Sequence, residues 1–154
     1  VPVTSVGVLE EGKETYGVTT FPTTSRFKAL AAYTTDMFRI GAEYNSTNNW
    51  TTLTTAAKDR ADGYSLFATY NLNDRFSVFG RYEMVKPSKD LAATRKENYF
   101  NVGVNFEPVK IVDFALVYKR DKVDNGLIGT SNGNIGGSTD GTYDEFGLWG
   151  QLRW

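Results

Sequence analysis

Apolar and polar residues alternate along the chain in seven separate segments, over residues 26–33, 36–45, 64–71, 75–85, 98–106, 110–120 and 146–154. An alternation with a period of two is typical of a β-strand that has one apolar and one polar face. Residues 1–24 alternate poorly, although 3–9 and 16–20 have some strand propensity, and Pro22 with its threonine neighbours is typical of a loop. The pattern predicts an all-β protein with seven clear strands.

The connections between these segments are of two kinds that take turns along the chain. Short turns are expected at 34–35, 71–74 and 107–108, and long polar loops at 46–63, 86–97 and 121–142. Such an order predicts antiparallel up-and-down strands with every long loop at one end of the sheet. Outer-membrane barrels have short periplasmic turns and long outer loops, whereas a soluble barrel has no reason to separate them.

The last strand ends on an aromatic residue, and its alternate positions before that end are apolar or glycine: Phe146, Leu148, Gly150, Leu152 and Trp154. This stretch resembles the C-terminal strand of the β-barrel proteins of Gram-negative outer membranes. The resemblance implies that these five residues form the assembly signal that the barrel-assembly machinery reads. It also implies a transmembrane β-barrel in contact with outer-membrane lipid and lipopolysaccharide.

Aromatic residues recur six positions apart on the apolar face, in the pairs Phe27/Tyr33, Phe38/Tyr44, Tyr64/Tyr70, Phe76/Tyr82 and Phe100/Phe106. Six residues span ~20 Å along a strand. Two rings of aromatics around a small aliphatic band resemble the girdles of membrane barrels. The other reading is a soluble barrel or sandwich, which would bury the aromatic pairs in its core and leave the charged face in water.

Composition excludes several functional classes. The 154 residues indicate one domain, and the net charge of −1 gives no basic footprint for nucleic acid. With no Cys and no His, the chain has no disulfides, no thiolate chemistry and no histidine general base, so we expect neither an enzyme nor a cofactor. The chain has no initiator Met and no signal peptide, which predicts a mature form or a fragment.

The long loops carry no recognisable site. The glycine-rich loop 124–141 lacks the spacing of a phosphate-binding loop. The four loop aspartates do not have the spacing of a calcium loop, namely Asp121, Asp124, Asp140 and Asp144. We therefore expect solvated outer loops and no bound metal.

The polar face has a coherent chemical character, because strand parity gives it six basic and four acidic residues: Lys28, Arg39, Glu43, Arg75, Arg81, Glu83, Asp113, Lys119, Glu145 and Arg153. Arg or Lys facing lipid at mid-depth would cost ~2–4 kcal/mol each, so this face is expected to point inward. In a wide barrel it lines a pore and biases which ions pass. In an eight-stranded barrel, whose lumen just holds side chains, the same charges form a plug. For Arg81, an ion pair with Glu83 or Glu43 is at least as good an interpretation as a solute contact.

The stretch 104–118 looks like the penultimate hairpin of the phosphate-selective and related anion porins, and this likeness covers roughly residues 64–154. It implies a monomeric or trimeric diffusion pore in the bacterial outer membrane. The chain lacks the full arginine ladder of such porins, which leaves phosphate specificity open. Bacterial barrels usually have an even number of strands, so either residues 1–20 supply an eighth strand or the chain is the C-terminal part of a larger barrel.

These patterns predict an outer-membrane porin for passive diffusion of small hydrophilic solutes or ions, with a slight anion preference. The alternative is a small closed barrel with a structural, adhesive or partner-binding role through its outer loops. A soluble barrel that binds an apolar ligand is a third interpretation.

Overall fold

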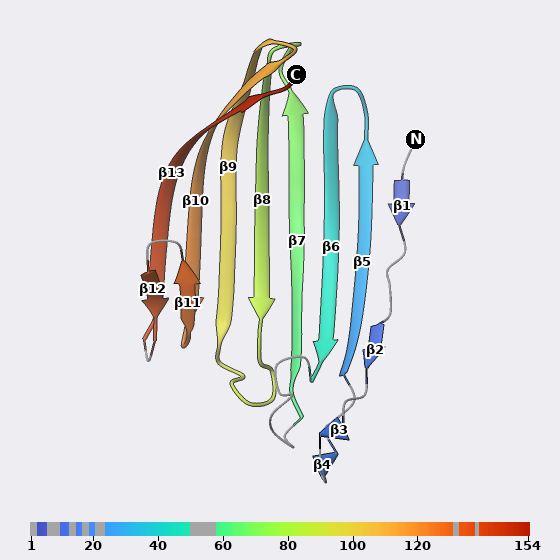
Figure 1. Cartoon of the computed structure of the whole chain (residues 1–154), viewed down its shortest axis with the longest axis vertical. Helices are drawn as coiled ribbons and strands as arrows, with labels where there is room; N and C mark the ends of the chain where they lie inside the picture. Colours follow the sequence, from blue (N-terminus) through green and yellow to red (C-terminus); the bar gives the residue numbers. More distant parts are fainter. Residues whose placement is uncertain are drawn as a thin grey trace.

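A computed structural model of the chain describes residues 3–5, 10–12, 15–16, 19–20, 24–49, 58–130, 133–137 and 139–154 (Figure 1). Its described residues are all-β and contain no helix. The expected loop from 46 to 63 falls partly outside these residues, as does most of 1–24.

Seven long strands form one antiparallel up-and-down sheet, which confirms the number expected from the sequence. They are β5 (Thr24–Thr34), β6 (Phe38–Asn48), β7 (Arg60–Asn71), β8 (Phe76–Lys86), β9 (Lys96–Val109), β10 (Val112–Asp124) and β13 (Gly141–Leu152), in that spatial order. Two short strands, β1 (Val3–Ser5) and β2 (Glu10–Gly12), pair with β5 and take the eighth position. Two small hairpins complete the fold: β3 (Thr15–Tyr16) with β4 (Thr19–Thr20), and β11 (Leu127–Thr130) with β12 (Gly133–Gly136).

The strands are longer than the alternation indicated, mainly at the end that carries the long loops. The ladder between β10 and β13 runs from Val112–Leu152 to Val123–Gly141, so residues 121–124 and 141–145 are strand rather than loop. Backbone pairing continues there although the outward side chains become charged or polar, so the apolar alternation stops before the strand does. At the opposite end, β8 begins at Phe76, one residue after the expected start at Arg75. The turn expected at 107–108 lies at 110–111 instead, because β9 continues to Val109 and β10 begins at Val112.

Side-chain oxygens close two of the short turns. Thr35 Oγ1 accepts hydrogen bonds from the backbone N–H of Met37 and Phe38, at 3.3 and 3.0 Å. Asn73 Oδ1 accepts from the N–H of Arg75 and Phe76, at 2.9 and 3.0 Å. Thr and Asn favour turns because their short side chains replace backbone partners in this way. In Figure 1 the short turns and the C-terminus lie at the top and the long connections at the bottom.

The sheet has almost no hydrophobic core of its own. Within the described residues, the buried apolar side chains are Val117 and Val123. The apolar face is exposed instead, with Phe38, Tyr70 and Leu148 at 38%, 42% and 75%. A sheet normally buries its apolar face against a second layer, and the described residues supply none.

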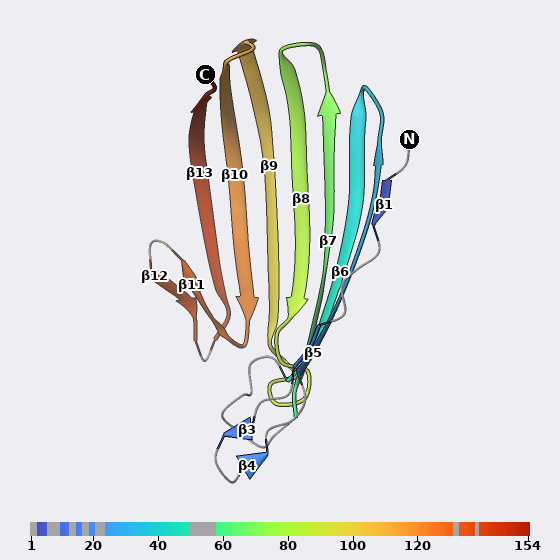
Figure 2. The same cartoon turned by 45° about the vertical axis from the view of Figure 1, so that its right-hand side comes forward.

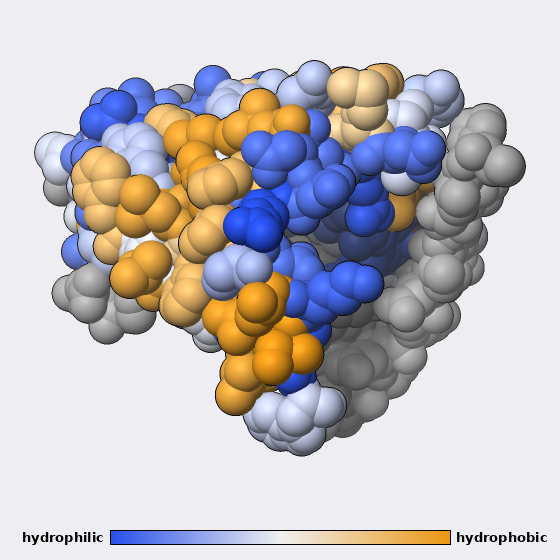
Figure 3. Space-filling model, turned by 90° about the horizontal axis from the view of Figure 1, so that it is seen from above, coloured by the Kyte–Doolittle hydropathy of each residue, from blue (hydrophilic) through white to orange (hydrophobic). Residues whose placement is uncertain are grey.

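The sheet is curved but open. Figure 3, which looks down from the short-turn end, shows hydrophobic residues on the convex side and hydrophilic residues in the hollow. The outer edge of β13 has no partner among the described strands, so closure into a barrel is not part of this structure. Figure 2 shows the β11–β12 hairpin standing apart from the sheet beside β13.

Candidate functional site: the concave ionic face

Facing residues of an antiparallel ladder share one face of the sheet, so the registers assign every side chain to a side. Lys119 faces Glu145 on one neighbouring strand and Asn101 on the other, and Arg81 faces Asn101 from β8. Further along the sheet, Glu43 of β6 faces Ser65 of β7, and Ser65 faces Glu83 of β8. The polar face therefore collects those of the predicted ionic residues that lie in strands, and we call it the ionic face.

Eight of the ten predicted residues form four ion pairs there. Lys28 Nζ lies 3.0 Å from Glu43 Oε1, and Lys119 Nζ lies 2.7 Å from Glu145 Oε1. The remaining two pairs are Arg81 with Glu83 and Arg153 with Asp113. Three of them join residues of the same or neighbouring strands, and the fourth joins Asp113 of β10 to Arg153, which directly follows β13. The interpretation of Arg81 as a partner of Glu83 is confirmed.

Arg39 and Arg75 have no ion-pair partner among the described residues. The Arg39 guanidinium lies 5.7 Å from the centroid of the Phe67 ring, a cation–π distance. Arg75 lies in the β7–β8 turn, where its carbonyl accepts a hydrogen bond from the Glu107 N–H at 2.8 Å. Both are near the short-turn end, so the charge left unpaired among the predicted residues is positive and lies there.

Aromatic rings also lie on the ionic face, each over a glycine. A Cβ at Gly41 would come within 2.3 Å of Phe67 Cζ, and one at Gly103 within 2.4 Å of Phe79 Cζ. On β13, Trp149 covers Gly147 and lies 5.6 Å from Lys119 Nζ. These rings fill space that a side chain would otherwise occupy and narrow the hollow locally. The alternation predicted that these rings lie on the polar face. It did not predict their contacts with glycine, because Gly41 and Gly103 belong to strands next to those of Phe67 and Phe79.

Two acidic residues of the ionic face, Glu97 and Asp121, lie in strands where the sequence predicted loops. Glu97 is in β9 and pairs with Arg95 at 2.6 Å, and Asp121 is in β10 between Tyr99 and Tyr143. Both lie in strand ends beyond the last aromatic residue of the outward face, where the expected strands stop. Knowledge of the register was needed to find them.

The predicted assembly signal lies on the convex apolar face at the free edge of the sheet. Phe146, Leu148 and Leu152 are exposed, and Trp154 follows the end of β13. Gly150 faces Phe114, whose ring would be 3.6 Å from a Cβ there. The row is therefore continuous with the apolar face of β10. Its recognition by an assembly machinery stays a prediction.

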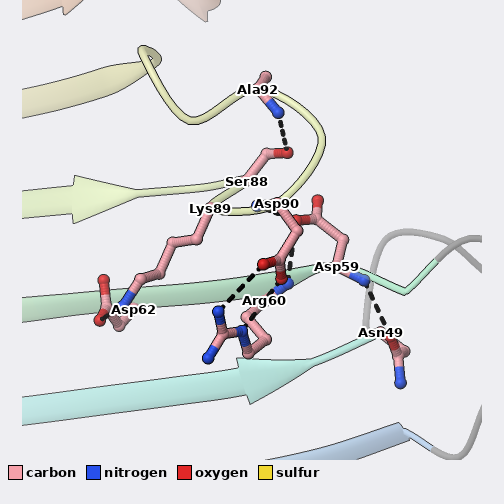
Figure 4. A network of polar contacts seen from close by, with 8 residues as sticks. All are labelled: Asn49, Asp59, Arg60, Asp62, Ser88, Lys89, Asp90 and Ala92. Atoms are coloured by element: carbon pink, nitrogen blue, oxygen red, sulfur yellow. Dashed lines mark hydrogen bonds and ion pairs between the residues drawn. The ribbon is translucent and has the colours of Figure 1, made fainter.

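A polar network fastens the β8–β9 loop to the start of β7 (Figure 4). Arg60 donates two hydrogen bonds to Asp90, both 3.0 Å, and Lys89 Nζ lies 2.6 Å from Asp62 Oδ2. The carboxylate of buried Asp59 accepts from the N–H of Arg60 and of Asp90 at 2.9 and 3.1 Å. The hydrogen bond from Arg60 holds the pKa of the Asp90 carboxyl below its ordinary value. The loop is thereby held at one position on the rim.

Among the described residues no group of three acidic side chains is placed to hold a metal ion. A helix long and apolar enough to cross a membrane is likewise absent from the part of the chain that the structure describes. Comparison of the chain with protein families, curated proteins and solved structures found no match. The resemblance to outer-membrane porins therefore stays an interpretation of the sequence.

Proposed function

We propose that this chain forms the wall of an outer-membrane β-barrel that acts as a passive diffusion pore. The observation that carries the proposal is the exposed apolar face, because a sheet with such a face and no core of its own needs a hydrophobic surrounding. Exposed apolar patches of this extent mark membrane or protein contacts rather than a free surface. Lipid covers the convex face in this proposal, and the hollow contains water.

The arrangement of aromatic rings supports the membrane part of the proposal. Phe76 stacks on Phe106 with centroids 4.6 Å apart near the short-turn end. Towards the long-loop end, Tyr118 contacts both Phe100 and Phe146, at 5.6 and 4.9 Å. Two bands of rings with aliphatic residues between them are typical of the two interfaces of a membrane.

Charge on the ionic face supports the pore's weak preference for anions. The four ion pairs cancel, so that Arg39 and Arg75 carry two unpaired positive charges against the carboxylate of Asp121, which has no ion-pair partner among the described residues. Diffusion through a hydrated lumen needs no other chemistry. The wall closes when the free edge of β13 gains a neighbour, either the eighth position of the same sheet or further strands.

The alternative is a small closed barrel that anchors or binds a partner through its outer loops. The observation that favours it is the pairing of eight of the ten charges, since paired charges can also fill a narrow lumen. Single-channel recording in planar bilayers separates the two. Discrete conductance steps with a reversal potential shifted towards anions are the expected result.

If the protein inserts into the bilayer and no conductance is recorded, the closed barrel filled by paired charges is the function that remains. A folded monomer that stays in solution without detergent would contradict both candidates, because both are membrane barrels. In that case a soluble barrel with an apolar ligand would take their place.

A further inference from the structure

Charged residues on the convex face gather at one end of the sheet. At the short-turn end, the described outward positions of the long strands are apolar, for example Phe76, Val112 and Leu152. At the long-loop end, beyond the second band of rings, eight of the outward positions are charged: Arg60, Asp62, Lys86, Lys96, Arg120, Lys122, Asp124 and Asp144. The two edges of the apolar face are therefore chemically different.

Four of these residues form one row across four strands. The registers place Asp62 of β7 opposite Lys86 of β8, and Asp124 of β10 opposite Lys96 of β9. Lys86 and Lys96 themselves are one position beyond the registered pair of Val85 and Glu97. If the register of Val85 with Glu97 is continued by one residue, Lys86 at the end of β8 comes opposite Lys96 at the start of β9, on the same side of the sheet.

Both carboxylates in this row already have other partners. Asp62 Oδ2 lies 2.6 Å from Lys89 Nζ, and Asp124 Oδ1 lies 2.9 Å from Lys122 Nζ. In the described part of the chain, Lys86 and Lys96 have no ion-pair partner. Like charges directly opposite on two strands destabilise a sheet, so an anion between them would be stabilising.

We propose that Lys86 and Lys96 form a binding site for the phosphate of a lipid headgroup in the outer leaflet. The row and the lysines paired with its aspartates together carry an excess of two positive charges. The four lysines are Lys86, Lys89, Lys96 and Lys122, and the two aspartates are Asp62 and Asp124. A phosphate monoester carries up to two negative charges and can accept hydrogen bonds from both ammonium groups.

Position favours a lipid over a dissolved ion. Lys86 is four residues beyond Tyr82 along β8, and Lys96 is four before Phe100 on β9, which places both ~13 Å past the ring band. If the rings lie at the membrane interface, the lysines lie at the level of the headgroups. The inference rests on the proposed membrane location and adds the chemistry of the lipid.

The test uses the whole chain purified from membranes in detergent and titrated with diphosphorylated lipid A, with binding counted by native mass spectrometry. We expect the double variant Lys86→Gln/Lys96→Gln to bind lipid A about tenfold more weakly or worse. Lys86→Arg/Lys96→Arg keeps both charges and should bind within about twofold of the wild type. The β-sheet circular dichroism of each variant shows whether it has folded.

A matched control removes the same charge elsewhere, by Lys58→Gln/Lys110→Gln in a long connection and in a short turn. Equal weakening in this control would show a general charge effect and overturn the site. An unchanged affinity in the glutamine variant would do the same, as would equal binding of dephosphorylated lipid A. Competition by millimolar inorganic phosphate would assign the lysines to a free anion instead. Conductance is measured in parallel, so a silent pore with intact lipid binding counts only against the proposed function.

Discussion

Replacing Leu116 by arginine tests which side of the sheet meets hydrocarbon. Leu116 is in the middle of β10, between Val104 and Leu148 on the neighbouring strands, and is 57% exposed on the convex face. Phe114 and Tyr118 flank it along the strand and belong to the two bands of rings. Leu116 therefore lies near mid-depth if the convex face contacts lipid.

The expected cost follows from that depth. An arginine on the lipid face of a barrel lowers the free energy of unfolding by ~2–4 kcal/mol at the midplane and by ~0–1 kcal/mol near an interface. On a water-exposed face the same change would stay within about 0.5 kcal/mol. The loss of unfolding free energy expected for a lipid-facing Leu116 is therefore several times that expected for a water-facing one, a difference that can be measured. The assay is urea unfolding of the chain folded into phosphatidylcholine vesicles, followed by tryptophan fluorescence.

Ala115→Arg is the matched control, because Ala115 is the next residue on the same strand and points to the ionic face beside Trp149. It should unfold within about 1 kcal/mol of the wild type, since a new arginine there lies in the hydrated hollow. Equal destabilisation by Leu116→Arg and Ala115→Arg would refute the assignment of the two faces. So would a negligible effect of Leu116→Arg in the bilayer.

Three further outcomes are expected. Arg39→Glu replaces an unpaired cation by an anion, and reversal potentials in a salt gradient should shift towards cations. Gly103→Val forces a side chain against the Phe79 ring and should destabilise the folded chain by about 1–3 kcal/mol in the urea assay. Asp90 has its pKa lowered by the hydrogen bond from Arg60, so its contribution is complete above the unfolded value of 3.8 and is lost as the pH falls through the lowered folded value. The protection of the β8–β9 loop against hydrogen exchange, taken relative to the intrinsic rate at each pH, should therefore fall as the pH is lowered through that window.

Each of these outcomes has a control. Lys110→Glu makes the same charge change in an exposed turn, and an equal shift of the reversal potential would contradict the role of Arg39. Gly150→Ala places a Cβ at ordinary contact distance, 3.6 Å from Phe114, and should be nearly neutral. Asp90→Asn should show the faster loop exchange already at neutral pH; slow exchange in that variant would show that Arg60 does not hold the loop through this carboxylate.

The sequence predicted the strands, their order and the division of residues between two faces. Period-two alternation depends on local backbone geometry alone, because successive side chains of a strand point to opposite sides. For that reason Lys28, Arg39, Arg81, Lys119 and the other predicted residues could be assigned to one face before any pairing was known.

The partners that these residues have on other strands came only from the register. Lys28 with Glu43 and Asp113 with Arg153 join different strands, and a shift of pairing by one residue would place other side chains opposite each other. Three other features depend on the same cross-strand alignment. They are the position of Gly103 beneath Phe79, the pairing of β10 with β13 beyond Lys119, and the position of Lys86 opposite Lys96.

The alternation also could not predict which face of the sheet is concave, because a strand with one apolar and one polar face has the same sequence pattern in either case. The tertiary structure decided it by curving the sheet with the ionic side inside and the apolar side outside. Sequence thus determined which residues share a face. Only the assembled sheet, through register and curvature, decided which of them meet and which face lines the hollow.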